Sequence, residues 1–391
     1  MHRVTTYPLG NADSCLITLS NGKKILFDYG AMRNPNDKND KRIDLAKALG
    51  DDLSTAKKEG YDVVAFTHLD NDHTHGAEDF FYFDHADKYK TKGRKKIATL
   101  WVPAAVITES CNELEPSSCV IQAEARHRLR KGYGIRVFSR PESLGDWLNK
   151  EKLTLDSRKD FITDAGNLAP DFNLQSDGIE FFVHSPFGWR QDDTVLDRNR
   201  DSLVMQAVFV VNGHSTKMLL GSDVDYKALT DIVVTTRRHK REARLEWDIV
   251  KLPHHCSYKT LSDKRGDDVT IPVEDVKWLF EKQGQHGCYI ISSSFPIPIK
   301  GTEADRSDQP PHRQAATYYS NLAKDKGGEF KVTMQYPSEE SPEPVEIEIS
   351  NSGARIIRTS SNAPSKNGLA KAVAAARGGS TPPQQQVGFG R

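Results

Sequence analysis

Five residues of the kinds that bind divalent metal lie close together directly after an apolar run. They are His68, Asp70, Asp72, His73 and His75. Neutral imidazole nitrogens and carboxylate oxygens are the donors that zinc, manganese and related ions take from proteins. A solvated polar loop or a helix cap is the alternative, but it accounts poorly for so many donors next to a buried strand at 61–66. The segment 67–76 therefore predicts a metal-binding loop.

Two later clusters supply further candidate ligands. Asp223 follows the apolar run 217–220, and the pair His254 and His255 follows the run 247–252. Each has an ordinary alternative, because an aspartate after a strand often forms a turn and a histidine is often a satisfied core or surface residue. Three polar clusters that each follow a strand are harder to explain in this way. We therefore interpret the later clusters as ligands that the fold brings to the loop.

These clusters need a sheet to position them. Runs rich in β-branched and aromatic residues predict strands, and amphipathic stretches predict helices. The strands expected are 3–7, 14–19, 24–28, 61–66, 97–102, 179–184, 202–211, 217–220, 247–252, 288–292, 330–335 and 345–359, and the helices are 44–59, 121–131 and 313–326. The pairs Asn21-Gly22 and Asn212-Gly213 are typical of hairpin turns. All three polar clusters fall at carboxyl ends of strands, where α/β proteins place their sites.

Composition limits the class of protein. The chain has 391 residues, enough for a full hydrophobic core, and its 54 basic and 54 acidic residues balance, so its overall charge favours neither polyanions nor polycations. The five cysteines include no C-x-x-C pair, which favours reduced thiols. No apolar run approaches the roughly 18 residues of a membrane-spanning helix. We expect a soluble, cytoplasmic protein with no membrane partner.

One large domain is expected, followed by a tail. Residues 1–359 hold all the expected strands and helices. Within them, we treat about 83–175 and 258–285 as insertions, the first of them helical and basic. Residues 360–391 are rich in Ser, Pro, Gly, Ala and Gln, a composition typical of a flexible, disordered tail.

Taken in order, the motifs resemble those of metallo-β-lactamase-fold hydrolases. The family's His-x-His-x-Asp-His is matched from His68 to His73, except that Asp70 stands for the second histidine. That change is similar to the hydrolase domain of ComEC-type DNA-uptake proteins. Other segments similar to that branch are 9–14, 27–30, 199–204, 220–223, 252–257 and 311–312. A glycine of the family's motifs is displaced or replaced at His75, Ser222 and Cys256.

The resemblance implies an α/β fold, a four-layer αββα sandwich, that binds two divalent metal ions. The ligands it implies are His68 and Asp70 on the first ion, Asp72 and His73 on the second, Asp223 between them, and His255, favoured over His254, in the last position. The third histidine of ordinary lactamases has no counterpart, and Asn199 stands near its place. A carboxylate at Asp70 makes the first site harder, which favours manganese or magnesium relative to an all-histidine site. Zinc or manganese is the ion expected.

Catalysis is expected to depend on water between the two ions. Ions about 3.5–4 Å apart would act on a phosphoryl or carbonyl group through a bridging hydroxide. Asp72 is expected to bind an ion and to orient that water, which makes it the first catalytic candidate. His312 is the second, as a group that assists the leaving group, and Asn199 and Ser257 are candidate substrate-binding residues. A structural role is the alternative for these last three.

The expected reaction is hydrolysis of a phosphodiester in nucleic acid or in a nucleotide. Basic runs at 92–96, 126–131 and 237–241 fit a phosphate backbone, although such runs are also ordinary solvated faces. The chief alternative is hydrolysis of a carbonyl substrate such as a lactone, a thioester or a β-lactam. A second alternative is a metal-binding sensor or scaffold without turnover. The motifs do not identify a protein partner.

Overall fold

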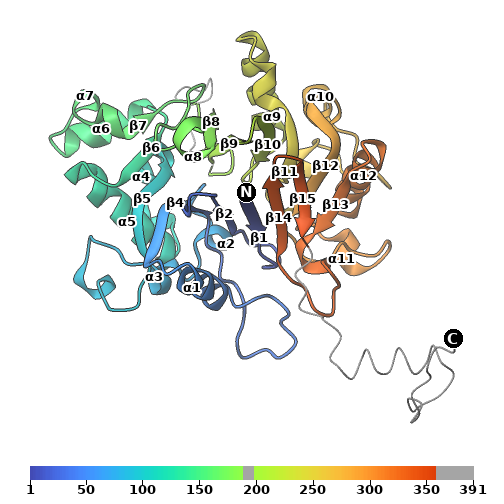
Figure 1. Cartoon of the computed structure of the whole chain (residues 1–391), viewed down its shortest axis with the longest axis horizontal. Helices are drawn as coiled ribbons and strands as arrows, with labels where there is room; N and C mark the ends of the chain where they lie inside the picture. Colours follow the sequence, from blue (N-terminus) through green and yellow to red (C-terminus); the bar gives the residue numbers. More distant parts are fainter. Residues whose placement is uncertain (188–197, 358–391) are drawn as a thin grey trace, which may run out of the picture. The chain divides into compact units, whose positions relative to one another are not determined.

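Two β-sheets with helices on their outer faces make up the protein (Figure 1). The computed structural model describes residues 1–187 and 198–357, and the tail expected at 360–391 lies outside them. Met1–Ile356 forms one compact unit. Among the described helices, none combines the length and the apolar character that crossing a lipid bilayer requires.

The larger sheet has nine strands within the described residues, in the order β15-β14-β1-β2-β3-β4-β5-β6-β7. They are β1 (His2–Thr6), β2 (Cys15–Thr18), β3 (Lys24–Phe27), β4 (Gly60–Ala65), β5 (Lys96–Pro103), β6 (Ile135–Phe138), β7 (Ile162–Thr163), β14 (Val345–Ser350) and β15 (Gly353–Ile357). The pairs from β14 through β3 are antiparallel, and those from β3 through β7 are parallel. The segment 83–175 supplies β5, β6 and β7, so it builds one side of this sheet.

The smaller sheet has six strands in the described ranges, in the order β13-β12-β11-β10-β9-β8. They are β8 (Ile179–Ser185), β9 (Val204–Val211), β10 (His214–Leu220), β11 (Trp247–Lys251), β12 (Gly284–Ser292) and β13 (Glu329–Val332). Strands β8 to β10 pair antiparallel, and β10 to β13 pair parallel. Both sheets therefore contain a run of parallel strands.

Helices occupy the connections between strands. The α-helices are α1 (Leu45–Thr55), α2 (Asn71–Thr74), α3 (Ala77–Phe80), α4 (Ala104–Thr108), α5 (Pro116–Lys131), α6 (Glu142–Lys150), α7 (Leu155–Arg158), α8 (Leu174–Asp177), α9 (Tyr226–Arg238), α10 (Glu274–Gln283), α11 (Glu303–Arg306) and α12 (Arg313–Asp325). The 3-10 turns are η1 (Asp87–Tyr89), η2 (Cys111–Glu113), η3 (Lys159–Phe161), η4 (Glu242–Leu245), η5 (His254–Cys256), η6 (Tyr258–Thr260) and η7 (Thr333–Gln335).

Helix α1 shows how local sequence sets these elements. Asp44 precedes the helix, and its side chain accepts a hydrogen bond from the Lys47 N–H, which satisfies a donor that the helix start leaves free. Leu45, Leu49 and Leu53 recur every four residues and are buried together against the larger sheet. The capping aspartate thus sets where the helix begins, and the leucine stripe sets which face packs inward.

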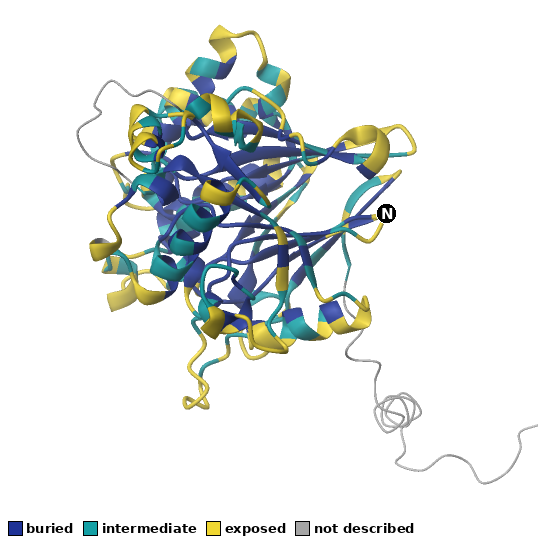
Figure 2. Ribbon diagram, turned by 90° about the vertical axis from the view of Figure 1, so that its left-hand side faces the viewer, coloured by how far each residue is buried: buried dark blue, intermediate teal, exposed yellow. Residues whose placement is uncertain are grey.

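Apolar side chains fill three layers. One cluster lies between the two sheets, a second between the larger sheet and helices that include α1, α5 and α6, and a third between the smaller sheet and α9, α10 and α12. Figure 2 shows the buried strands in the middle, with exposed residues on the helices outside them. This arrangement confirms the α/β class and the αββα order of layers expected from the sequence.

The carboxyl ends of strands from both sheets lead into the polar clusters. Strand β4 runs into the segment that begins at Thr67, β10 into Asp223, and β11 into His254 and His255. Because parallel strands place their carboxyl ends at one edge of a sheet, side chains from these loops gather at that edge. The fold therefore brings the segment that begins at Thr67 together with clusters that lie about 150 to 190 positions later in the chain.

The cysteines differ from the sequence-based expectation. Cys111 and Cys119 form a disulfide, so the expectation of five reduced thiols is wrong for this pair. Cys15, Cys256 and Cys288 are buried free thiols. The bond joins η2 to the first turn of α5, where the two Cα atoms lie 5.7 Å apart, within the usual range for a disulfide. A turn that only the folded chain makes brings these two residues together.

We expect Trp101→Ala to destabilise the protein by about 3 to 5 kcal/mol, because it removes the largest side chain between the sheets and leaves a cavity. Trp101 is fully buried and packs edge-on against Phe27, Phe138 and Phe181. Urea unfolding measures the change. Ile271→Ala is the control, since that side chain is 75% exposed and its loss should cost less than about 0.5 kcal/mol. Equal effects of the two substitutions would contradict this account of the core.

Candidate metal centre

The loop expected to bind metal leaves the larger sheet at the end of β4. The Thr67 N–H donates to Asp28 Oδ1 (2.7 Å), and the Thr67 hydroxyl donates to the other oxygen of that carboxylate (2.8 Å). Farther along, the hydroxyl of Ser118 in α5 donates to the Leu69 carbonyl oxygen (2.8 Å). Neighbours from β3 and from α5 thus hold the loop in place.

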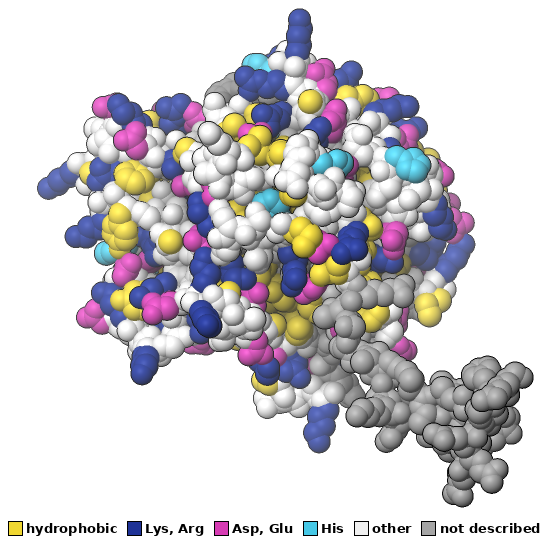
Figure 3. All heavy atoms as spheres, viewed as in Figure 1, with side chains coloured by type: hydrophobic (Ala, Val, Ile, Leu, Met, Phe, Trp, Pro, Cys, Tyr) yellow, Lys and Arg dark blue, Asp and Glu magenta, His cyan; other side chains and the backbone are white. Residues whose placement is uncertain are grey.

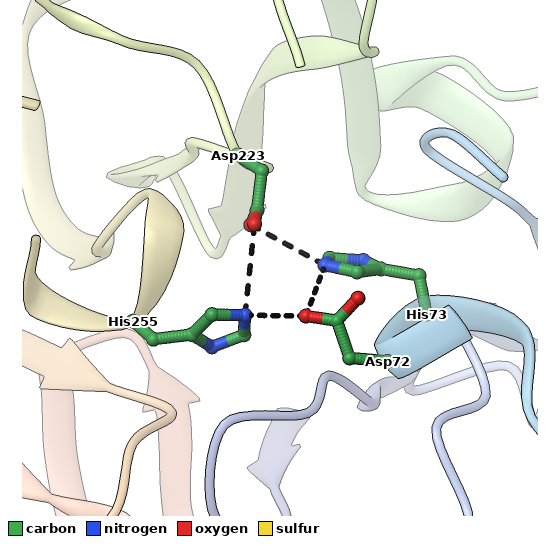
Figure 4. A group of neighbouring side chains, drawn as sticks. All are labelled: Asp72, His73, Asp223 and His255. Atoms are coloured by element: carbon green, nitrogen blue, oxygen red, sulfur yellow. Dashed lines mark hydrogen bonds and ion pairs between the residues drawn. The ribbon is translucent and has the colours of Figure 1, made fainter. Parts of the chain in front are cut away.

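Four side chains of the expected ligand set meet at the shared edge of the sheets. These are Asp72, His73, Asp223 and His255, here called the four-ligand group, and one donor atom of each lies within 4.8 Å of the others (Figure 4). His255 Nε2 lies 2.9 Å from Asp72 Oδ2, and His73 Nε2 lies 3.3 Å from Asp223 Oδ1. The second oxygen of Asp223 faces His255 Nε2 at 3.6 Å. Asp223 thus turns one oxygen toward each histidine of the group.

Each histidine of the group is oriented through its other ring nitrogen. His73 Nδ1 lies 2.9 Å from Asp28 Oδ2, and His255 Nδ1 lies 2.7 Å from the Ser293 carbonyl oxygen. A carboxylate and a carbonyl oxygen only accept hydrogen bonds, so both Nδ1 atoms donate. A neutral ring then presents the lone pair of Nε2 to the centre, which is the form that binds metal.

A second group of donors shares His73 with the first. Asp13 and Asp28 complete it, and their donor atoms and that of His73 lie within 4.8 Å of one another. Asp13 also forms a buried ion pair with Lys251, the last residue of β11. The Lys251 side chain is only 5% exposed, so carboxylates replace the hydration that the ammonium loses. Positive charge is therefore built into the buried side of the centre.

The charges of the centre shift the pKa values of its members in opposite directions. Burial by itself would raise the pKa of Asp72, but His73 and the hydrogen bond from His255 lower it to about 2. Burial by itself would lower the pKa of His255, yet Asp223 and the hydrogen bond to Asp72 raise it to about 9. Against the effect of burial, His255 and His73 likewise lower the pKa of Asp223. Asp223 and Asp28 raise the pKa of His73, again against the effect of burial. The centre thus attracts cations, whether protons or metal ions.

His68 and Asp70 lie beside the four-ligand group. The Thr67 hydroxyl gives its hydrogen to Asp28, so it accepts from His68 Nδ1 (3.1 Å), and His68 Nε2 carries the lone pair. This Nε2 is buried without a hydrogen bond in the described structure, and Asp70 Oδ2 lies 3.5 Å from it. The Nε2 lone pair and the carboxylate oxygen face each other with no hydrogen between them, and a cation bound there would accept a lone pair from each. The residues therefore fit an ion at this position.

Three other candidates lie around the centre and outside the four-ligand group. His254 is next to His255 in the chain, but the centroids of the two rings are 6.4 Å apart. The Ser257 hydroxyl accepts from the Lys259 N–H and so caps η6, which is a structural role. Asn199 Oδ1 is buried and has no hydrogen-bond partner among the described residues.

His312 packs against the segment that carries His255. The backbone N–H of His312 donates to the Cys256 carbonyl oxygen (3.1 Å), and the ring Nδ1 accepts from the backbone N–H of Tyr258 (3.3 Å). Burial and the nearby Arg265 lower the pKa of His312 to about 4. The ring is therefore neutral with its proton on Nε2, which is buried and has no hydrogen-bond partner in the described part of the chain.

The backbone is strained where these histidines lie. His254, His255 and Cys256 have φ values of 49°, 52° and 63°. Left-handed backbone costs a residue other than glycine on the order of 1 kcal/mol or more, so three in succession need support. The Cys256 carbonyl oxygen accepts from His312, and the His254 carbonyl oxygen accepts from the Ser257 N–H (2.9 Å). The φ of Cys256 also explains why the related motif has glycine at this position.

Sequence reasoning missed three charged residues of the centre. Asp13 and Asp28 lay inside the motif segments 9–14 and 27–30 without a stated role, and Lys251 was counted only as part of a strand. Asp28 follows β3, and Lys251 ends β11, so both stand at the carboxyl ends of strands like the expected ligands. Their position at strand ends is the sequence feature that could have identified them.

Comparison with known proteins gives likenesses of structure only. No protein-family model matches the chain, and no curated protein sequence matches it. The subclass B3 metallo-β-lactamase MEM-A1, isolated from a soil metagenome library, is 14% identical, covering 64% of this chain and 75% of its own, with a TM-score of 0.33. Unliganded yeast PDE1 is 10% identical, covering 85% and 96% of the two chains, with a TM-score of 0.40.

A third similar structure is Tm1679, a metal-dependent hydrolase of the β-lactamase superfamily. It is 11% identical and covers 90% of this chain and 100% of its own, with a TM-score of 0.36. At these identities and TM-scores, the likenesses do not extend to substrates. The closer resemblance to ComEC-type hydrolase domains stays a prediction from the motifs.

We expect the free energy of unfolding of the chelator-treated protein to decrease as the pH rises from 6.5 to 9. The pKa of His255 is about 9 in the folded protein and 6.5 in an unfolded chain. The stabilisation is therefore complete below pH 6.5 and is lost as the pH rises through 9, by an amount on the order of 3 kcal/mol. Urea unfolding at constant ionic strength measures it.

The control for this measurement is a histidine outside the centre. His239 is exposed, so His239→Gln should keep the pH dependence, whereas His255→Gln should reduce it. His73 contributes in the same direction, which leaves part of the slope in the second variant. A free energy of unfolding that does not change over this pH range would contradict the charge arrangement described above.

Proposed function

We propose that this protein is a metal-dependent hydrolase that uses two divalent ions, manganese or zinc, to cleave phosphodiester bonds in nucleic acid or in a nucleotide. The observation that supports this most is the convergence, at one edge of the two sheets, of the four-ligand group with His68 and Asp70. Imidazole and carboxylate donors from three separate strand ends are a set that holds metal ions. A polar cluster with only a structural role does not require such a set of donors.

The charge balance supports two ions rather than one. The carboxylates of the centre are Asp13, Asp28, Asp70, Asp72 and Asp223. The positive charge of Lys251 cancels the charge of one carboxylate, and the charges of Arg198 and Glu109 cancel each other. The excess of four negative charges equals the charge of two divalent cations. Asp13, Asp28 and Asp223 are buried, and an excess of negative charge around buried carboxylates is costly unless cations neutralise it.

The described side chains have distinct tasks in this proposal. His68 and Asp70 would hold the first ion, the four-ligand group would hold the second, and Asp223 would face both. Bound there, divalent ions supply Lewis acidity that activates water and neutralises charge on the scissile group. Asp72 is the most exposed member of the four-ligand group, at 29%, so its carboxylate is the one placed to orient water and accept its proton. His312, neutral with a proton on Nε2, would donate that proton to the leaving oxygen.

The substrate proposed is an anion because the donor set is rich in oxygen. Carboxylates outnumber imidazoles, and such sites favour hard ions, which in turn bind phosphoryl oxygens well. An acyl substrate such as a lactone needs an apolar pocket beside the water. The side chains that contact His73 in this centre include Asp13, Asp28 and Thr67, which are charged or polar.

The basic run at 126–131 contributes less to substrate binding than its composition indicates. In α5, Arg126 donates to the carbonyl oxygens of Ile107 and Glu109, and Arg130 pairs with Glu151. Figure 3 shows basic and acidic side chains interspersed on the face that it draws. The proposed anionic substrate is therefore recognised close to the metal centre, and an extended basic surface is not required.

We expect the metal-loaded protein to hydrolyse bis-p-nitrophenyl phosphate and to lose this activity when a chelator removes the metal. Asp72→Asn should lower kcat by about a hundredfold or more, because the amide neither holds the ion nor accepts a proton from water as a carboxylate does. Release of p-nitrophenol over time measures the rate, and elemental analysis measures the bound metal.

Asp156→Asn is the matched control, because this aspartate is 88% exposed in α7, and the variant should keep full activity. Cleavage of acyl esters or lactones alone would show that the bond assigned here is wrong. Tight metal binding with no cleavage of any of these substrates would support the non-catalytic sensor or scaffold instead.

A further inference from the structure

An arginine that sequence reasoning gave no role contacts the metal centre from its open side. Arg198 Nη1 lies 3.3 Å from Asp70 Oδ1, and the same guanidinium forms an ion pair with Glu109. Asp70 turns its other oxygen toward His68 Nε2, at 3.5 Å. The two oxygens of Asp70 are thus divided, so the carboxylate can hold an ion with His68 while it keeps its contact with Arg198.

The position of Arg198 is set from another part of the fold. Glu109 is 7% exposed and follows α4 directly. Its carbonyl oxygen accepts hydrogen bonds from Gln122 (3.0 Å) and from Arg126 (2.8 Å), both in α5. Because α5 packs into the core against the larger sheet, these bonds fix the backbone of Glu109. Its buried carboxylate is therefore a fixed anchor. It holds the guanidinium next to Asp70.

Two side-chain cations contact carboxylates of the centre in the described residues, and they differ in exposure. Lys251 is 5% exposed and pairs with the fully buried Asp13, so it lies where a substrate cannot reach it. Arg198 is 27% exposed and Asp70 is 34% exposed, so the arginine stands at the accessible side. A guanidinium offers several N–H donors in one plane, a geometry that matches the oxygens of a phosphoryl group.

We propose that Arg198 binds the phosphoryl group of the substrate, and that Glu109 is the positioning residue that holds the guanidinium in place. The inference rests on the proposed function, since it assigns the contact that recognises the anion at the proposed metal centre. It also explains why extended basic surfaces are not needed: one arginine fixed beside the first metal position supplies the contact. The alternative is that Arg198 serves only to neutralise Asp70.

Arg198→Gln separates these alternatives because glutamine keeps polar character without the charge. In the metal-loaded protein we expect the KM for bis-p-nitrophenyl phosphate to rise about ten- to a hundredfold, the range of a lost charge-assisted contact, with a smaller effect on kcat. The dissociation constant for inorganic phosphate, measured by isothermal titration calorimetry, should rise by a similar factor. Metal content should stay at the wild-type level.

Two further variants sharpen the test. Glu109→Gln leaves the arginine in the chain but removes its anchor, so it should raise the KM less than Arg198→Gln does. Arg140→Gln is the matched control, because that arginine forms a surface pair with Asp164, and the variant should bind phosphate as the wild type does. Arg198→Lys keeps one charge without the planar donors and should recover part of the affinity.

Unchanged KM and unchanged phosphate affinity in Arg198→Gln would overturn the inference. Loss of metal together with unchanged phosphate affinity would also overturn it, because Arg198 would then serve Asp70 alone. If the wild type cleaves no phosphodiester, the proposed function fails, yet the calorimetric comparison still decides the role of Arg198. A weaker binding of phosphate by Arg198→Gln would in that case support an anion site without phosphodiester turnover.

Discussion

The crowding of carboxylates around two buried histidines is the constraint on which the rest of the site depends. Within the four-ligand group, imidazole nitrogens and carboxylate oxygens approach to between 2.9 and 3.9 Å. The donor oxygens of Asp72 and Asp223 also lie within 4.8 Å of each other, and two carboxylates at such a separation repel strongly unless cations lie among them. Lys251 neutralises the charge of Asp13. The pKa values of His73 and His255 are raised, so protons on these two histidines neutralise neighbouring carboxylates when no metal is bound. Metal ions compete for the same positions.

Buried strands and hydrogen bonds hold the charged side chains of the centre close together despite their repulsion. Each cluster follows a buried strand, and hydrogen bonds from α5 and from His312, which precedes α12, hold the loops that carry the ligands. The left-handed backbone from His254 to Cys256 persists because such bonds surround it. The two cations of the centre have separate positions: Lys251 compensates charge on the buried side, and Arg198 stands on the side that solvent reaches.

Much of the fold could be predicted because its elements depend on local pattern. Alternating apolar residues and the Asn-Gly turns predicted most of the strands, and the density of donors from His68 to His73 predicted the metal loop. Within the segment 83–175 the strand β5 was predicted, but β6 and β7 were not, because these short strands are recognisable only from the strands beside which they lie. The disulfide between Cys111 and Cys119 was missed because nothing in the spacing of the two cysteines indicates the turn that joins them.

The sequence by itself determined which residue types were available and that three polar clusters follow strands, since both are properties of neighbouring positions. The resemblance favours His255 over His254, but the tertiary structure decided that His255 faces Asp72, because a left-handed backbone and a bond to Ser293 set the direction of the ring. It also decided which carboxylates Lys251 and Arg198 contact. The effect of a charge depends on the carboxylates that lie within a few ångströms of it, and residues about 130 to 240 positions away in the chain supply these.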